Sequence, residues 1–532
     1  MTVIGRSVLL LLAAGALAGP VSAQDPADEA WNRGDTDAAR RLYAERLAAD
    51  SSDIRALHRM ALMFAWDNQF PPSLALFDRL LSISPENIDA RVGRARVLAW
   101  AGRLAESIAA HEAALARHPG DRQVLLGLAL VLAWDNQLDS AKSIYGHLVG
   151  ADSADVQGWQ GLARTVAWHG DLIDAERQWR DALLRDDGNP ELLIGLSQTL
   201  RWQGRNDAAR EVLERVPADA RQSRGYLEEA RSIAVGLDPR MTPRMILEID
   251  SDDNTIATVV LRGDMPIAPR FRVGLDAYAR HADWDAPLQE SRRAWGAALT
   301  GQVLLEPGWT VRAGVGASGS NGIGASTEPT VQARIASPAR YRFGGTATFQ
   351  RSALDATALL IDSGVTYTEG GISFRAQPAY QLSLEAGGAV ANFVQSDQSN
   401  RRLSGFLAAT QRLSPSWAAA VRLRLFGFRI ANALIGLFDP GFYNLNELIG
   451  RWRPVRGPYH VTLEVSPGLE KVGSDGSFHG TVRALVTGAY DIAPGRQIGI
   501  TTLYSNAGLQ SFSTGEEGYR YFSISLFGSW VF

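Results

Sequence analysis

A tryptophan recurs every 34 residues through the first half of the chain, and this period constrains the fold more than any other feature. Each of the five tryptophans ends a similar stretch, such as G-R-A-R-V-L-A-W or G-L-A-L-V-L-A-W; they are Trp66, Trp100, Trp134, Trp168 and Trp202. A turn such as D-N-Q or A-G-R follows, and asparagine and glycine suit the left-handed conformation that ends a helix. The pattern predicts a stack of helix pairs, one pair per period.

A 34-residue period of paired helices resembles the tetratricopeptide repeat. The second helix of each pair offers one large packing residue: Phe77, His111, Tyr145, Trp179 or Leu213. Trp31 lies 35 residues before Trp66 and indicates an incomplete first repeat, so we expect about six repeats over residues 24–236. We interpret the five tryptophans as repeat-packing residues rather than as a ladder for stacking sugars, because they share one phase beside the turn. The resemblance implies a concave surface that binds a protein or polymer.

The first 23 residues predict export. Arg6 precedes the apolar run Val8 to Ala18, which is too short to span a bilayer, and Val21-Ser22-Ala23 fits a small-x-small cleavage site. We therefore predict a signal peptide over residues 1–23. The chain has no cysteine, which excludes disulfides and thiolate metal sites, and its net charge of −4 over 532 residues gives no sign of a nucleic-acid partner.

The hydrophobic period changes from about 3.6 to 2 after a short linker, residues 237–242, in which Asp238-Pro239 breaks the last helix. Residues 243–532 are rich in short alternating segments. The last of these, Y-R-Y-F-S-I-S-L-F-G-S-W-V-F, places mostly apolar residues on one face and hydroxyl-bearing residues on the other, and ends on Phe532. It resembles the closing strand of a bacterial outer-membrane β-barrel.

Two kinds of connection alternate between the predicted strands. Seven are tight and contain proline, as in S-P-A-R and A-P-G-R, and eight are polar and often longer. Fifteen connections join sixteen strands, and an even number places both barrel ends on the side of the short turns. Two stacked soluble sandwiches would not require this alternation. We predict an α + β chain of two domains: a tetratricopeptide α-solenoid, then a 16-stranded antiparallel transmembrane β-barrel over residues 243–532.

This architecture resembles the outer-membrane exporters of exopolysaccharide, in particular those for poly-N-acetylglucosamine and cellulose. The turn signature in W-A-G-R-L-A-E-S and W-Q-G-R-N-D-A-A, together with the barrel, is also similar to YaiO-type outer-membrane proteins. The resemblance implies a bacterial outer-membrane porin that exports a polysaccharide, with periplasmic repeats that guide the polymer or dock synthesis proteins. The alternative is a non-conducting outer-membrane scaffold whose repeats recruit periplasmic partners.

Alternation assigns many arginines and one tyrosine to the inner face of the barrel, as candidates for transport: Arg272, Arg280, Arg334, Arg342, Arg422, Arg424, Arg451, Arg453, Arg483 and Tyr278. Fewer acids, Asp276, Glu447 and Glu464, share that face. This balance favours an anionic or strongly hydrogen-bonding cargo. An equal alternative is that the arginines pair with carboxylates on loops or a plug. The loop Arg429 to Asn444 is unusually apolar, and we expect it to pack on the barrel wall or inside it.

Catalytic motifs are missing from the sequence: there is no G-x-S-x-G, no H-E-x-x-H and no phosphate-binding glycine loop. The histidines of the repeats are scattered rather than placed at metal spacing. We therefore expect neither an enzyme nor a cofactor or metal site, and take the partners to be membrane lipids, a polysaccharide and synthesis proteins.

Overall fold

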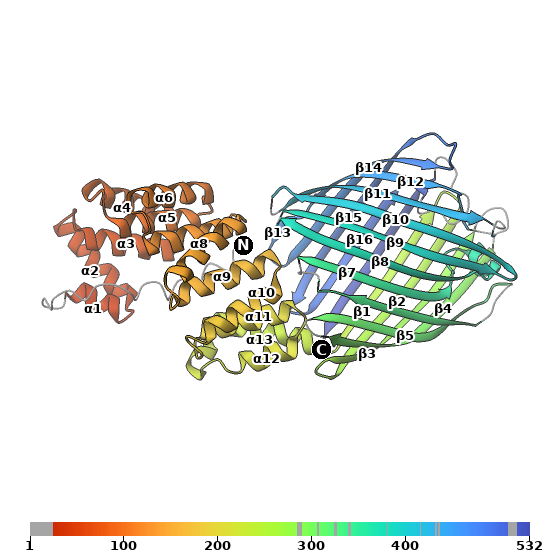
Figure 1. Ribbon diagram of the computed structural model, residues 1–532, viewed down its shortest axis with the longest axis horizontal. Helices are drawn as coiled ribbons and strands as arrows, with labels where there is room; N and C mark the ends of the chain where they lie inside the picture. Colours follow the sequence, from red (N-terminus) through yellow and green to blue (C-terminus); the bar gives the residue numbers. More distant parts are fainter. Residues whose placement is uncertain are drawn as a thin grey trace. The chain divides into compact units, whose positions relative to one another are not determined.

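The computed structural model, shown in Figure 1, describes residues 25–284, 290–305, 308–323, 327–338, 342–379, 381–414, 416–430, 434, 437–508 and 519–532. The predicted signal peptide, residues 1–23, lies outside the described residues. Within those ranges, no helix is both long and apolar enough to cross a membrane. The chain forms two compact units: one runs to Leu196 and includes Val212–Glu228, and the other contains Ser197–Glu211 and Glu229–Phe532.

The helices pair as the 34-residue period predicts. The first helix of each pair ends at the repeated tryptophan or one residue later: α3 (Ile54–Trp66), α5 (Ile88–Trp100), α7 (Arg122–Trp134), α9 (Val156–His169) and α11 (Pro190–Trp202). The second helices are α4 (Phe70–Ile83), α6 (Leu104–Arg117), α8 (Leu138–Ala151), α10 (Leu172–Leu183) and α12 (Asn206–Leu213). Before them, α1 (Pro26–Asn32) and α2 (Thr36–Ala49) form the expected incomplete repeat, and η1 (Ala218–Gln222) and α13 (Arg224–Leu237) follow.

The turn inside each repeat has the predicted left-handed residue. The backbone φ is positive at Asn68 (60°), Gly102 (78°), Asn136 (65°), Gly170 (95°) and Gly204 (84°). Asparagine and glycine tolerate this conformation better than other residues, so the turn can reverse the chain within a few residues.

The large residue of four second helices, α4, α6, α8 and α10, packs against a glycine of the next first helix. A Cβ atom placed on Gly93 would lie 2.6 Å from the ring of Phe77, and one on Gly161 would lie 2.1 Å from the ring of Tyr145. These distances leave no room for a side chain, so the recurring glycine lets neighbouring repeats approach closely.

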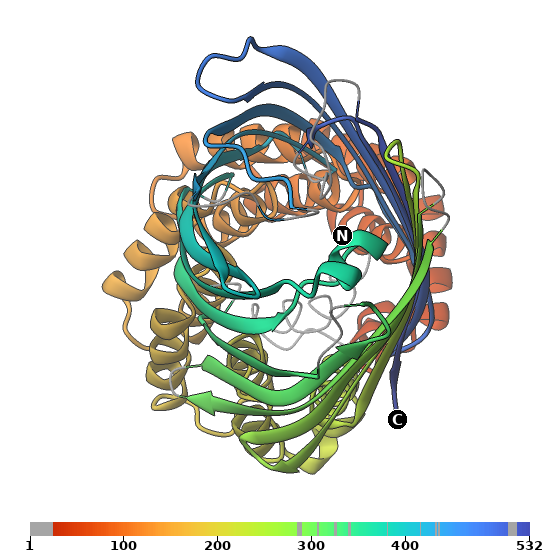
Figure 2. The same cartoon turned by 90° about the vertical axis from the view of Figure 1, so that its right-hand side faces the viewer.

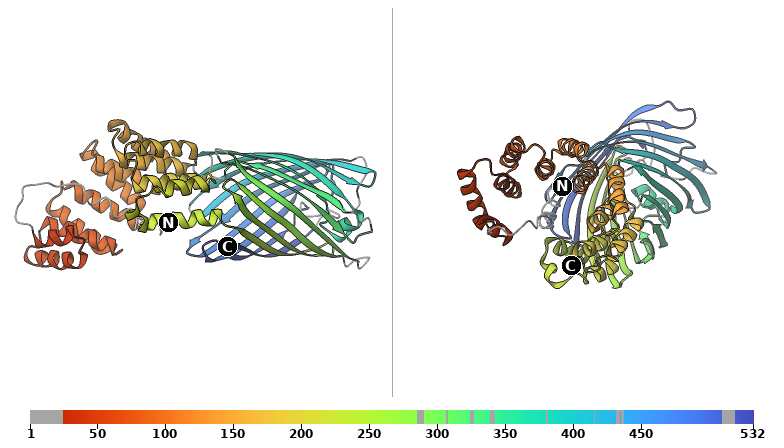
Figure 3. Two further views of the ribbon diagram at one scale, coloured as in Figure 1. Left: turned by 90° about the horizontal axis from the view of Figure 1, so that it is seen from below. Right: turned by 60° about the vertical axis from the view of Figure 1, so that its left-hand side comes forward.

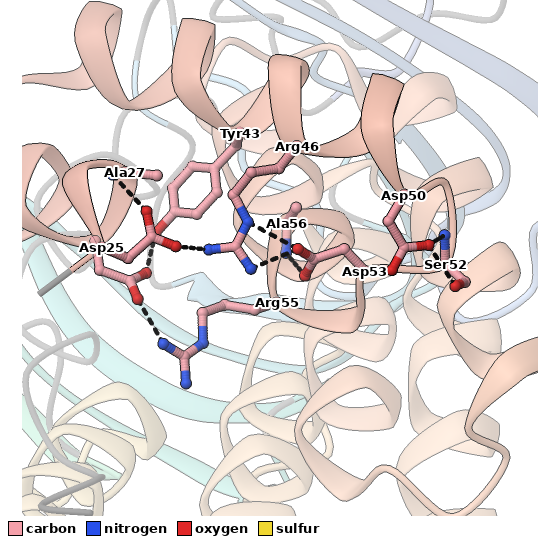
Figure 4. A network of polar contacts seen from close by, with 10 residues as sticks. Asp25, Ala27, Tyr43, Arg46, Asp50, Ser52, Asp53, Arg55 and Ala56 are labelled. Atoms are coloured by element: carbon pink, nitrogen blue, oxygen red, sulfur yellow. Dashed lines mark hydrogen bonds and ion pairs between the residues drawn. The ribbon is translucent and has the colours of Figure 1, made fainter. Parts of the chain in front are cut away.

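Charged residues link the three N-terminal helices α1, α2 and α3, as Figure 4 shows. Asp25 accepts a hydrogen bond from the backbone N–H of Ala27, and Asp53 accepts one from that of Ala56, each at 2.9 Å. Arg46, near the end of α2, donates to both aspartates. One guanidinium therefore links the N-caps of α1 and α3.

The strand region forms one closed antiparallel sheet of sixteen strands among the described residues. Seventeen segments are assigned, but β13 pairs with β14 directly beyond β12 and continues that strand. The segments are β1 (Arg240–Asp250), β2 (Asn254–Ala268), β3 (Phe271–Trp284), β4 (Glu290–Leu305), β5 (Trp309–Ser320), β6 (Glu328–Ala336), β7 (Phe343–Ala353), β8 (Thr366–Ala379), β9 (Leu382–Gln395), β10 (Gln398–Arg412), β11 (Trp417–Ile430), β12 (Tyr443–Trp452), β13 (Val455–Arg456), β14 (Tyr459–Val472), β15 (His479–Ala493), β16 (Arg496–Ser505) and β17 (Tyr521–Val531).

The barrel closes between its first and last strands, where Arg240 pairs with Val531 and Asp250 with Tyr521. The strands tilt across the barrel, as the view from below in Figure 3 shows. The predicted linker, residues 237–242, spans the end of α13 and the first three residues of β1. Because β1 and β17 pair along their whole length, the sheet has no free edge.

The outer face of the barrel is apolar. Leu299, Val315 and Leu403 are each at least 65% exposed, and in the terminal strand Phe522, Leu526 and Phe532 also point outward. The residues between them along each strand point into the lumen, as alternation requires. A closed barrel with this outer face satisfies every strand hydrogen bond internally, which is what a membrane-spanning sheet needs.

Candidate functional site in the barrel lumen

Two carboxylates on one wall of the lumen are each shared by two of the predicted arginines. Glu447 of β12 accepts a hydrogen bond from Arg422 at 2.8 Å and lies 3.7 Å from Nε of Arg424. Glu464 of β14 accepts from Arg451 of β12 and Arg483 of β15, each at 2.8 Å.

The carboxylates on this wall are almost completely buried: Glu447 is 3% exposed and Glu464 is 7% exposed. Because each buried carboxylate accepts hydrogen bonds from arginines, it holds their guanidinium groups against the wall.

Two other predicted residues contact a carboxylate that lies outside the strands. Arg280 donates to Oδ1 of Asp355 at 2.7 Å and to its backbone carbonyl oxygen at 2.6 Å. The hydroxyl of Tyr278 donates to Oδ2 of the same aspartate. Asp355 lies between β7 and the short helix α14 (Ala358–Ser363). At this position an inner-face arginine therefore pairs with a carboxylate of a loop, which is the alternative that the sequence left open.

The remaining predicted arginines lie toward the short turns. Arg272 pairs with Asp264 and donates to the carbonyl oxygen of Asp238 at 2.8 Å. Arg342, just before β7, donates to the carbonyl oxygen of Pro378 at 2.9 Å. Arg334 of β6 is exposed on the inner face, whereas Arg453 lies between β12 and β13, outside the paired ladder.

The lumen also contains ion pairs that the sequence did not predict. Arg312 pairs with Asp276 at 2.8 Å, and Arg402 pairs with Glu369 at 3.0 Å. Strand alternation could have placed all of these except Asp355, whose position depends on how its loop folds.

A plug crosses the lumen near the ends of the strands that carry the longer loops. Ala358 and Ile361 of α14 pack with Ile256, Ala282 and Ala294 from β2, β3 and β4. On the other side of the same helix, a second cluster joins it to β9 and β11: Leu360, Val365, Ala391, Phe393, Phe428, Leu434 and Leu437. Figure 2, which looks into the barrel, shows the helix inside the ring of strands.

The apolar loop Arg429 to Asn444 contributes to this plug. Leu434 and Leu437 are buried in the second cluster, and the ring of Phe438 lies 6.3 Å from Phe426 and 6.1 Å from Tyr443. The prediction that this loop packs against or inside the barrel is confirmed for these residues; residues 431–433 and 435–436 lie outside the described ones.

A cavity of about 610 Å³ lies along the inner wall formed by β7 to β12. Its charged lining residues are Arg422, Arg424, Arg451 and Glu385. Hydroxyl and aromatic side chains complete the lining, among them Thr346, Thr348, Ser404, Thr410, Phe406 and Phe426. Such a lining can hydrogen-bond and stack on a polar ligand.

The repeated tryptophans are all half-buried. Trp66 stacks on Trp31 with ring centroids 5.1 Å apart, and Trp66 and Trp100 pack against a core that contains Leu57 and Phe77. Their assignment as packing residues, like the transport role of the lumenal arginines, stays a prediction.

Comparison with known proteins gives a repeat family and distant structural likenesses. A tetratricopeptide repeat model matches residues 169–230. A solved bacterial polysaccharide outer membrane secretin is 13% identical, covering 56% of this chain and 99% of its own, with a TM-score of 0.44. The type IV pilus biogenesis factor PilW is 21% identical, covering 38% of this chain and 94% of its own, with a TM-score of 0.34. No curated protein matches the sequence.

TM-scores this low give no basis for transferring a function. What the repeat model and the geometry establish is the architecture: the chain combines tetratricopeptide repeats with a closed antiparallel barrel of sixteen strands among its described residues.

Proposed function

We propose that this protein is a porin of the bacterial outer membrane that exports an exopolysaccharide. The observation that carries the proposal is the contrast between the two barrel faces. The outer face is apolar, whereas the inner face carries ion pairs, hydroxyls and a cavity of about 610 Å³. A polar, water-filled lumen allows a hydrophilic polymer to cross a bilayer without entering hydrocarbon.

The repeats supply the second part of the proposal. An even strand number puts both barrel ends, and hence the chain that enters β1, on the side of the short turns. In the outer membrane this is the periplasmic side. We place the repeats there, where their concave surface guides the polymer or docks synthesis proteins. The proposal assigns no catalytic activity to the chain, so exported polymer should keep its length.

The plug favours a second candidate, a non-conducting scaffold. Two apolar clusters join α14 to opposite walls of the barrel, and Arg280 and Tyr278 hold Asp355 beside it. A lumen closed in this way at all times would leave the repeats as the functional part.

Conductance separates the two candidates. The mature full-length chain is inserted into planar bilayers and compared with a variant in which residues 354–365 are replaced by a flexible glycine-serine segment. Export predicts that this variant conducts steadily and that vesicles containing it pass polysaccharide fragments. A correctly folded variant that never conducts would refute export and support the scaffold.

A further inference from the structure

We propose that the wall formed by Arg422 and Arg424 is a binding subsite for the anionic group of an acidic polysaccharide, such as a uronate carboxylate or a sugar sulfate. The inference rests on the proposed export function for the route by which the polymer reaches the lumen. It adds the chemical class of the polymer and the residues that recognise it.

Charge at this wall is unbalanced. Four guanidiniums, those of Arg422, Arg424, Arg451 and Arg483, share the two carboxylates of Glu447 and Glu464. Elsewhere in the lumen the pairs are one to one, as for Arg312 with Asp276 and Arg402 with Glu369. Glu470 of β14 is a third buried carboxylate on these strands, and it contacts His479 and the backbone N–H of Gly508 rather than an arginine. The four guanidiniums therefore outnumber the carboxylates of this wall by one positive charge.

One arginine donor on this wall lacks a partner. The Nη2 atom of Arg422 is buried and makes no hydrogen bond among the described residues. A buried donor without an acceptor costs on the order of 1–3 kcal/mol. Arg424 lies 3.7 Å from the shared carboxylate, beyond hydrogen-bonding distance, so it too has donor capacity to offer. A ligand oxyanion would satisfy donors from both residues at once.

The surroundings of the two arginines fit a sugar. They line a cavity of about 610 Å³ together with hydroxyls of Thr346, Thr348 and Ser404, which is within the size range of sites for small ligands. The ring of Phe426 also lines it, and that ring is fixed by stacking on Tyr443 at 4.3 Å. The ring therefore gives the cavity a fixed apolar contact beside its polar groups.

Glu385 is the acidic member of the lining. It lies on β9, whereas the arginines lie on β11. A bound anion is repelled from Glu385 and attracted to the arginines, so the cavity orients an acidic sugar with its anionic group toward β11. Glu385 can then accept hydrogen bonds from sugar hydroxyls.

Binding to the detergent-solubilised full-length protein tests the subsite without requiring conduction. Fluorescence anisotropy is measured with labelled oligogalacturonate, a sulfated dextran oligosaccharide and a neutral malto-oligosaccharide of similar length. We expect the anionic probes to bind at least about 10-fold more tightly than the neutral one, with the preference weakening in salt. Comparing the affinities for oligogalacturonate and for the sulfated dextran oligosaccharide shows whether the site prefers a carboxylate or a sulfate.

Variants of the arginines test whether the preference for anionic probes comes from this wall. The double variant Arg422→Gln, Arg424→Gln should lose about 10-fold or more of the affinity for the anionic probes and little for the neutral one. Arg262→Gln removes an exposed arginine of β2 that does not line the cavity, and this variant should bind as the wild type does. Circular dichroism checks that each variant keeps the barrel.

The outcomes separate this inference from the export function. Equal binding of anionic and neutral probes, or a folded double variant with unchanged affinity, would overturn the anionic subsite even if the barrel conducts and passes polymer. Arginine-dependent anion binding by the protein, together with a folded variant lacking residues 354–365 that never conducts, would support the subsite and contradict export.

Discussion

At the scale of single residues, a glycine in each of the four first helices α5, α7, α9 and α11 sets how closely neighbouring repeats pack. Gly93, Gly127, Gly161 and Gly195 face Phe77, His111, Tyr145 and Trp179, respectively. The side chains differ, yet each fills the space that the missing Cβ leaves. The array therefore tolerates different large residues so long as the glycine opposite them is kept.

Replacing one of these glycines should destabilise the repeats. The added methyl group of Gly161→Ala would lie 2.1 Å from the Tyr145 ring, so we expect a loss of about 1–3 kcal/mol in the free energy of unfolding. The control is Gly146→Ala in α8, where a Cβ meets no atom within 4 Å and alanine favours the helix. Urea unfolding followed by helical circular dichroism measures both; equal stability of the two variants would contradict the packing role.

A half-buried histidine, His58, makes the stability of the repeats depend on pH. Burial, and next the neighbouring Arg59, lower the pKa of His58 to about 4. The unfolded chain, with a histidine pKa near 6.5, binds the proton more readily. The contribution of His58, on the order of 3 kcal/mol, is complete above about pH 6.5 and is lost as the pH falls toward 4.

This dependence is measured by urea unfolding at about pH 7 and about pH 5. His58→Gln should flatten it, whereas His147→Gln, at an exposed position, should keep it. An unchanged slope in His58→Gln would show that other groups cause the loss of stability.

At the scale of elements, α14 is a short helix that packs against the inner face of the barrel. Its six residues contact strands from both walls, and Thr357 caps its first turn through the backbone N–H of Leu360 at 3.2 Å. Asp355, bound by Arg280 and Tyr278, fixes the chain that leads into it. The plug is thus held by apolar packing at the helix and by charge beside it.

Weakening the charged contact should loosen the plug without unfolding the barrel. Asp355→Asn removes the ion pair with Arg280, and we expect more frequent channel openings in planar bilayers, because one of the two restraints is lost. Asp475→Asn is the matched control, since Asp475 is exposed in the loop between β14 and β15. If both variants open as rarely as the wild type, Asp355 does not hold the plug closed.

At the scale of the whole molecule, the even number of strands fixes which connections lie at the end of the barrel where the chain enters β1. The chain enters β1 and leaves β17 at the same end, because Arg240 pairs with Val531. The eight polar connections, of which several are long, lie at the opposite end.

Surface labelling tests this topology. An epitope inserted after Asp475 should be labelled on intact cells, whereas an epitope inserted after Ser52, in the turn between α2 and α3, should be labelled only once the outer membrane is permeabilised. Labelling of Ser52 on intact cells would invert the proposed orientation.

The sequence by itself determined the repeat boundaries, the strand number and the two faces of each strand. These follow from local rules: a 34-residue period fixes the helix pairs, glycine and asparagine fix their turns, and alternation fixes which side chains point inward. Arg422, Arg424 and Glu447 could be assigned to one face because they lie on strands with a clear period of two.

Only the tertiary structure decided what those inward residues meet. Asp355 and Leu360 lie in a connection without strand periodicity, so no local rule places them inside the barrel. Arg280 pairs with Asp355, 75 residues further along the chain, and Phe428 shares an apolar cluster with Leu360 of α14. An inward arginine can pair with one carboxylate, share a carboxylate or keep a free donor. Which of these occurs depends on closure of the sheet and on the loop that folds into it. Both are long-range events that strand alternation does not encode.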